Sequence, residues 1–567
     1  MNEDKPPNTR RSEGSTNRAA DPDYIGEAHG KVADIGKGRR WYDLPYRFIR
    51  WLLFARPKRF IPARVRPHLS NIQNYLLPYY SHELHRAWDP ADPRHNIHVP
   101  DDEHVTIPGL WAVELFPPSE IDALNRAFER NGWDRRRVSI GTGEQNRTML
   151  NRSRTGQGWS WWRLGEVSGE GSPYVFPDSV REKLPPHIGA IELGAIQIGS
   201  GLTAVVAHFH LNEAGSEYVD EMWHRKHEPE IVYRKRRRPH ANDRMFTAYR
   251  KTQNARRELH EEARAWMSDR CPGYFSANGK TQPLMDMLLL EKYDPILATR
   301  DDRKYWDALR ALGITDNSLY RTSKDLPNLV LSEVEGRMCP PFEGDHTWTL
   351  WGNTTSVAQS MQNLHFYGKE HRRAISNAAD DSLSNFLVTL GIANFLSVIE
   401  ERYAVLRDDA RSRHGRFKAA YIKQLRASFL TMSLDLTSIS RDLGDFWRRK
   451  TRYLGEPRFV LDYAPWIVME DEAQNRPRFT PIDFNKHVRK VCKRRVTSLL
   501  QADKDYREIL STVASLGSSI DTYKISRLAT WISLASLAVA SATLAVTDIG
   551  SGALLSGLAD MLRAITG

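Results

Sequence analysis

An uncharged stretch near the end of the chain, LATWISLASLAVASATLAV at residues 528–546, constrains the fold more than any other feature. A helix of this length rises about 28 Å, close to the roughly 30 Å hydrocarbon core of a bilayer. Lys524 and Arg527 precede the stretch and Asp548 follows it. Because positive flanks stay on the cytoplasmic side, the sequence predicts a single-pass transmembrane helix with the bulk of the chain cytoplasmic, at the cell's inner (cytoplasmic) membrane.

The alternative for this stretch is a buried helix of a soluble core. Five Ser and Thr residues make its insertion into a bilayer marginal, but a soluble helix would need a polar face, and none is present. Small residues recur at four-residue spacing, as at Ala529, Ser533, Ser541 and Ala545. This spacing lets membrane helices pack closely, so the sequence also predicts a homo-oligomer.

The whole chain is basic, with 81 Lys and Arg against 70 Asp and Glu and a net charge of +11. Such a surface attracts polyanions, either membrane lipids or nucleic acid. The densest basic runs are residues 234–238 and 489–495, and the stretch GWSWWRLG offers aromatic side chains for stacking on bases. Lipid is the preferred partner because the second run lies just upstream of the predicted span. Cys271, Cys339 and Cys492 fit no disulfide or metal spacing, which indicates a reducing compartment.

The predicted fold class is an α+β cytoplasmic domain with a mixed or antiparallel sheet, followed by a mainly α-helical region, a helical stalk and a C-terminal transmembrane helix. Residues 100–365 form the α+β domain, because they alternate helix patterns with strand-like runs. The clearest expectations are two strands folded about Gly199-Ser200-Gly201 and a long helix over 242–270. Further strands are predicted in LMDMLLLEKY, LPNLVLSEV and HTWTLW.

Strand patterns nearly vanish beyond residue 370. Residues 386–398 are apolar on all sides but too short to span a bilayer, which predicts a buried helix. A long amphipathic helix follows over 417–446, and apolar residues at alternating spacings of three and four form a heptad seam over 499–523. This coiled-coil pattern fits either pairing with the 417–446 helix or an oligomeric stalk. The predicted boundaries are 366–480 for the helical region, 481–527 for the stalk and 528–546 for the span.

The remaining segments are short. Residues 1–40 are polar and charged and are predicted to be a disordered tail. Residues 41–99 begin with aromatic and basic residues, which suit either the surface of an anionic membrane or a helix docked on the core. Residues 547–567 are predicted to be a short amphipathic tail, lying on a surface or re-entering the bilayer.

The most metal-like group consists of His208 and His210 in HFH, with His224 and His227 in EMWHRKH. Residues two apart share a strand face and residues three apart share a helix face, so these histidines can converge on one Zn²⁺ ion. Alternatively, His208 and His210 form the solvent side of a half-buried strand. His260-Glu261-Glu262 is expected on a solvated helix face, and the sequence identifies no catalytic residue and no other cofactor.

These features predict a membrane-anchored cytoplasmic sensing, scaffold or effector protein, non-enzymatic and oligomeric, that responds to a protein or small-molecule ligand. A bacterial membrane effector has this layout. In layout alone the chain resembles the CorA-type magnesium channels, which implies an ion channel or transporter as one alternative. The Gly-Met-Asn signature of that family is absent, since VTDIGSG stands after the predicted span. A zinc-dependent hydrolase built on the histidines is the other alternative.

Overall fold

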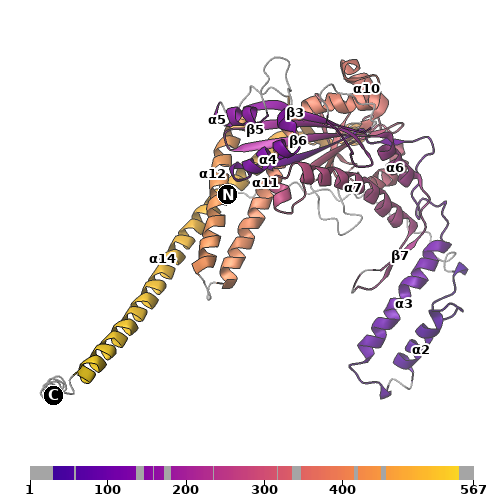
Figure 1. Ribbon diagram of the computed structural model, residues 1–567. Helices are drawn as coiled ribbons and strands as arrows, with labels where there is room; N and C mark the ends of the chain where they lie inside the picture. The colour runs from indigo at the N-terminus through magenta and orange to yellow at the C-terminus, as the bar shows by residue number, and fades with distance from the viewer. Residues whose placement is uncertain are drawn as a thin grey trace. The chain divides into compact units, whose positions relative to one another are not determined.

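The computed structural model in Figure 1 describes residues 30–55, 59–135, 146–156, 159–170, 180–233, 235, 237–315, 317–334, 347–413, 419–448 and 455–547. The chain divides into two compact units, the first formed by Met1–Phe395 with Arg441–Cys492 and the second by Leu396–Ser440 with Lys493–Gly567. The predicted N-terminal tail up to residue 29, the C-terminal segment from residue 548 and Cys339 lie outside the described residues.

The first unit is built on a mixed sheet, which confirms the predicted α+β class. Two pairs of neighbouring strands, β9 with β12 and β3 with β4, run parallel, and the other neighbours run antiparallel. In spatial order the strands are β14 (Ile482–Asp483), β13 (Phe459–Tyr463), β10 (Leu319–Ser323), β11 (Val330–Glu333), β12 (Thr347–Asn353), β9 (Leu284–Leu290), β2 (Gly109–Phe116), β6 (Leu202–Leu211), β5 (Ile188–Ile198), β3 (Trp159–Gly169) and β4 (Val180–Glu182). The short β1 (Val105–Thr106) also pairs with β9, and β7 (Glu230–Val232) forms a separate ribbon with β8 (His240–Asn242).

Several helices of the first unit lie beside these strands (Figure 1). The longer ones carry most of the packing described below, and among the described residues four short 3-10 turns, Pro118–Glu120, Trp133–Arg135, Arg300–Tyr305 and Leu364–Tyr367, connect elements. The helices are α2 (Asp43–Phe54), α3 (Arg66–Ala87), α4 (Ile121–Arg130), α5 (Asn146–Thr155), α6 (Glu213–His224), α7 (Arg244–Arg270), α8 (Tyr274–Ala277), α9 (Trp306–Ala311), α10 (Thr354–Ser360), α11 (His371–Arg413), α12 (Ala419–Arg448), α13 (Pro465–Ala473) and α14 (Phe484–Thr547).

The predicted hairpin is confirmed as β5 and β6, which pair antiparallel around Gly199. Gly199 has a φ of +57°, and a Cβ atom there would collide with the Asp442 side chain, so only glycine fits this turn. Asp442 accepts a hydrogen bond of 2.6 Å from the Gly201 amide. The tip of the hairpin is therefore held by a residue 241 positions later in the chain.

The central strands are buried on both faces, and helices cover both. On β6, Phe209 makes an edge contact with Trp266 of α7, while the neighbouring His208 bonds Ser376 of α11. Because successive side chains of a strand point to opposite faces, α7 and α11 lie on opposite sides of the sheet. His208 and His210 are both buried, so the alternative that they form a solvent-facing strand side is wrong.

The long helix predicted over 242–270 is confirmed as α7, which begins after Asp243, an N-cap that accepts a bond from the Phe246 amide. Its inner face holds β9 through Asp286, which is fully buried. The Asp286 carboxylate accepts bonds of 2.6 Å from Arg256 and of 2.8 Å from His260. Burial raises the pKa of Asp286, but Arg256 and His260 outweigh burial and hold it well below its usual range. His260, which was expected on a solvated face, instead packs inside the protein.

We expect Arg256→Ala to lower the free energy of unfolding by about 3–5 kcal/mol, because it leaves the buried Asp286 carboxylate without its main counter-charge. Urea denaturation followed by tryptophan fluorescence measures this loss. Arg94→Ala removes an ion pair with Asp92 at the surface and is the matched control, with an expected loss below about 1 kcal/mol. Equal losses in the two variants would contradict the role given to Asp286.

The second unit is helical in its described residues, and it uses the predicted heptad seam within the chain. Asp503 of α14 is fully buried and accepts hydrogen bonds from Tyr403 of α11 at 2.8 Å and from Ser433 of α12 at 3.0 Å. The rings of Tyr403, Phe429 and Tyr506 contact one another beside it. Of the two alternatives for the seam, pairing with the 417–446 helix is therefore observed at Tyr506, and an oligomeric stalk stays a prediction.

Among the described residues, one helix is long and apolar enough to cross a membrane, His371–Asp408, and 83% of its apolar window is buried in the protein. It contains residues 386–398, so the prediction of a buried helix there is confirmed. The predicted span at 528–546 is helical as the last part of α14, and its crossing of a bilayer stays a prediction. The region predicted as mainly helical, 366–480, also contains β13, which pairs with β10 in the sheet.

Candidate functional site

A polar pocket of about 520 Å³ lies where the sheet meets α6 and the start of α11. Its wall combines histidines, carboxylates and two arginines with a few small or apolar side chains. The charged and histidine lining residues are His104, His210, Glu213, Glu217, Asp220, Glu291, Glu370, Arg372 and Arg373. Convergent polar groups in a concave space can fix the orientation of a ligand, which makes this pocket the candidate site.

Helix α6 positions one wall of the pocket because its first turn is capped. The Asn212 side chain accepts a bond of 3.0 Å from the Gly215 amide, which fixes the start of α6 directly after β6. Two side chains on the next turns then hold the chain around β1. Ser216 accepts a bond from the Ile107 amide at 3.1 Å, and Asp220 accepts one from the Val105 amide at 2.9 Å.

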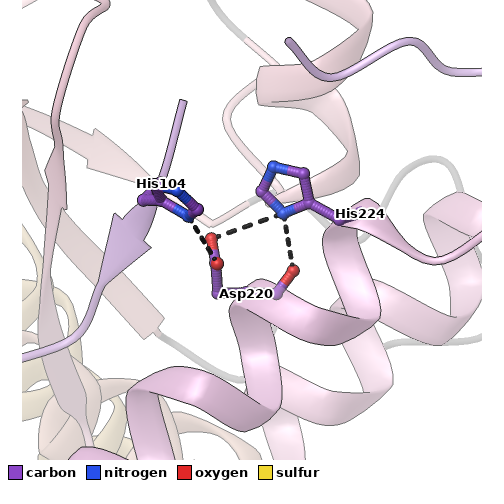
Figure 2. A group of neighbouring side chains, drawn as sticks. All are labelled: His104, Asp220 and His224. Atoms are coloured by element: carbon purple, nitrogen blue, oxygen red, sulfur yellow. Dashed lines mark hydrogen bonds and ion pairs between the residues drawn. The ribbon is translucent and has the colours of Figure 1, made fainter. Parts of the chain in front are cut away.

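The first group of interacting side chains is His104, Asp220 and His224, and Figure 2 shows both rings turned toward Asp220. His104 Nδ1 lies 2.9 Å from Asp220 Oδ2. His224 stands one helical turn after Asp220, and its Nδ1 lies 2.9 Å from the Asp220 carbonyl and 3.5 Å from Oδ1. The hydrogen bond to Asp220 raises the pKa of His104, and the nearby charges of Glu291 and Glu103 act in the same direction.

The second group is Glu192, His208 and His210, on the face of the sheet covered by α11. Glu192 on β5 pairs directly with His208 on β6, and His210 Nε2 lies 2.8 Å from the Glu192 carboxylate. The two imidazole rings are 4.1 Å apart between centroids. Burial lowers the pKa of His208 well below its usual value, and His210 adds to this effect. Burial raises the pKa of Glu192, but His210, His208 and Arg163 outweigh it and hold it at about 2.

Asp380 of α11 adds a second carboxyl group beside these histidines. It accepts a hydrogen bond of 2.8 Å from the Trp111 indole and lies 3.8 Å from His208 Nδ1. Burial, reinforced by the charge of Glu192, raises the pKa of Asp380 to about 7. One carboxyl is thus held ionised, while the other exchanges its proton near neutral pH. Two carboxyls whose pKa values are pushed apart can act as a base and an acid.

The structure separates the four histidines that the sequence grouped as metal ligands. His208 and His210 lie together with Glu192, whereas His224 joins His104 and Asp220. His227 belongs to neither group, since its Nε2 bonds the Met222 carbonyl at 3.0 Å.

Sequence reasoning missed three members of these groups, His104, Glu192 and Asp220. Asp220 lies 116 residues after His104, and Glu192 lies 18 residues before His210. No local spacing relates residues so far apart. The one signal within reach was the i, i+4 spacing of Asp220 and His224, which places both on one face of a helix.

No protein family model, no curated protein and no solved structure matches this chain.

The raised pKa of Asp380 predicts a pH dependence of stability. The folded protein keeps the Asp380 proton up to about pH 7, whereas the unfolded chain releases it near the ordinary aspartate pKa of 3.8. The free energy of unfolding should therefore fall as pH rises between these values, by at most about 4 kcal/mol. Asp380→Asn should remove this contribution, as measured by urea denaturation between pH 4 and 8.

Trp111→Phe provides the companion test, because the indole hydrogen bond favours the ionised form of Asp380. Its removal should move the pH midpoint of the stability loss above 7, whatever the variant does to overall stability. If the free energy of unfolding depends on pH in the same way in Asp380→Asn and in the unchanged protein, the raised pKa of Asp380 is contradicted.

Proposed function

We propose that this chain is a membrane-tethered binding protein of the sensing, scaffold or effector type, in which the end of α14 is the tether and the first unit holds a ligand in the polar pocket. The observation that supports a membrane tether is the exposure of large apolar side chains on α14. Each of six such side chains between residues 528 and 539 is 54% to 67% exposed: Leu528, Trp531, Ile532, Leu534, Leu537 and Val539.

These six side chains do not form a single stripe. At 100° per residue, Leu528 points about 120° away from Leu534 and about 180° away from Leu537, and the six side chains together spread over about 220° of the helix surface. A protein groove covers one side of a helix, whereas hydrocarbon covers every side. Burying a large apolar side chain is worth about 1.5–3 kcal/mol, so a bilayer gains from all six.

The flanks of this segment favour one orientation and an assembly. Lys524 and Arg527 precede it, which supports an orientation with the part of the chain before the segment on the cytoplasmic side of an inner membrane. Small residues at four-residue spacing, such as Ala529 and Ser533, support close packing with other copies of the helix. Membrane lipids and further copies of this chain are therefore the proposed partners.

Helix α2 supports a second contact with the membrane surface. It packs on α3 through Ile49 and Leu53, but its other face exposes Leu44, Phe48 and Trp51 at helical spacing. Arginines 47 and 50 are exposed in the same helix. Aromatic and basic side chains together suit an anionic surface, where each nearby cation is worth about 1 kcal/mol.

Nucleic acid is the less favoured partner for the basic surface. In the run at 489–495, Arg489 pairs with Glu456 and Arg495 lies 3.8 Å from Glu400, so carboxylates of the chain already meet two of its cations. The other run, at 234–238, is only partly among the described residues.

Alkaline carbonate extraction of membranes tests the tether. We expect the full chain to remain in the pellet, and the double variant Leu534→Arg, Leu537→Arg to move to the supernatant. Each arginine at the centre of a span costs about 2.5–3.5 kcal/mol of insertion free energy. Leu297→Arg, at a leucine that is 72% exposed in the first unit, is the matched control and should stay in the pellet.

Extraction of the unchanged chain into the supernatant would contradict the tether. If the double variant stays in the pellet, Phe48→Glu and Trp51→Glu are added to it. Release of this quadruple variant into the supernatant would show that α2 holds the chain on the membrane instead.

A further inference from the structure

We propose that His104, Asp220 and His224 form a binding site for a divalent transition-metal ion, with Zn²⁺ as the ion that best fits the donors. Two imidazole nitrogens and one carboxylate oxygen all lie within 4.8 Å of one another. Imidazole and carboxylate are the donors that Zn²⁺ takes from proteins besides cysteine. The inference rests on the ligand-binding part of the proposed function, since it names the chemistry of what the pocket binds.

The distances within the group are close to those of a tetrahedral site. Ligands about 2.0–2.1 Å from a tetrahedral Zn²⁺ ion are about 3.3 Å apart. Here His104 Nδ1 lies 2.9 Å from Asp220 Oδ2, and His224 Nδ1 lies 3.5 Å from Asp220 Oδ1. The two nitrogens face different oxygens of the carboxylate, so the rings must turn until the three donor atoms, which all lie within 4.8 Å of one another, reach that separation. The bond of His224 Nδ1 to the Asp220 carbonyl would be exchanged for the bond to the metal.

Rigid elements hold the three side chains before any ion arrives. Asp220 and His224 stand one turn apart on α6, and His104 directly precedes β1. The Asp220 carboxylate also accepts a bond of 2.9 Å from the Val105 amide, which fixes its orientation as outer hydrogen bonds do in known metal sites. The His104 carbonyl accepts a bond from the Glu291 amide, which ties this end of β1 to the chain after β9. Little ordering is then left for the ion to impose.

Charge favours a cation at this group over the group on β5 and β6. Five carboxylates line the pocket against two arginines, and Arg372 is already paired with Glu291. At the other group, the guanidinium of Arg163 contacts Glu192 and supplies the positive charge that an ion would bring. A metal ion at Glu192 would have to displace that arginine or bear its repulsion.

The geometry also indicates what the ion would do. Three protein donors leave a fourth tetrahedral position for water or an anionic group of a ligand, as in zinc sites that exchange ligands. His104 and Asp220 both line the pocket, so this position is reached from the 520 Å³ space. The ligand class that follows is a small molecule or peptide with a carboxylate or phosphate group, held by the ion and by Arg372 or Arg373.

Zinc titration of the full chain in detergent, after removal of metals with a chelator, tests the site. Isothermal titration calorimetry should show one Zn²⁺ per chain, and Co²⁺ in its place should give the intense visible absorption of a tetrahedral site. His104→Ala and Asp220→Asn should each weaken binding by about 100-fold or more, because loss of even an outer partner costs 10–100-fold.

Two other histidine variants complete the test. His98→Ala removes an exposed histidine of the same unit and is the matched control that should leave zinc affinity unchanged, whereas His210→Gln tests whether the second group holds the ion instead. The side chain of His104 is about half exposed, so His104→Ala should fold, and it remains decisive if Asp220→Asn does not. Absence of stoichiometric zinc, or affinity lost in His210→Gln but kept in His104→Ala, would overturn the inference. Neither outcome bears on the tether, because membrane attachment is tested separately by carbonate extraction.

Discussion

The burial of the central strands on both faces is the constraint from which most of the first unit follows. With α7 on one side and α11 on the other, any polar side chain on β2, β5, β6 or β9 must find a partner inside the protein. Asp286 finds Arg256 and His260, and His210 finds Glu192. Glu114 is held by Ser276 and by amides at the start of α8. These pairs select one arrangement of helices on the sheet, because any other leaves a buried charge unmatched.

The pocket lies at the end of β6, beyond the part of the sheet that helices cover on both faces. At the end of β6 the chain turns into α6 through the Asn212 cap, and His210 is the last histidine of the strand to reach the open space. The two polar groups differ in environment, and of the second group only His210 lines the pocket. Glu192 is neutralised by Arg163, whereas His104 and Asp220 remain accessible and sit among carboxylates, which suits a cation.

Much of the local structure could be predicted because it depends on neighbouring residues. The Gly199 turn, the helix that ends at Arg270 and the apolar core of α11 all rest on spacings within a few residues. The prediction failed where long-range pairing decides. β13 is a five-residue run among helices, and its pairing with β10 joins residues more than a hundred positions apart. His260 was expected in solvent because its neighbours in sequence are charged, but it is buried and forms a hydrogen bond with Asp286.

The sequence by itself determined an α+β unit with a basic surface, helical segments after it, and an apolar segment that no polar face shields in α14. These properties follow from periodicity and composition, which are local. Only the tertiary structure decided that the four histidines divide between two groups, and that His104, Glu192 and Asp220 complete those groups. A site joins side chains across the sheet, and spacing along a chain does not encode distances between strands and helices that meet only after folding.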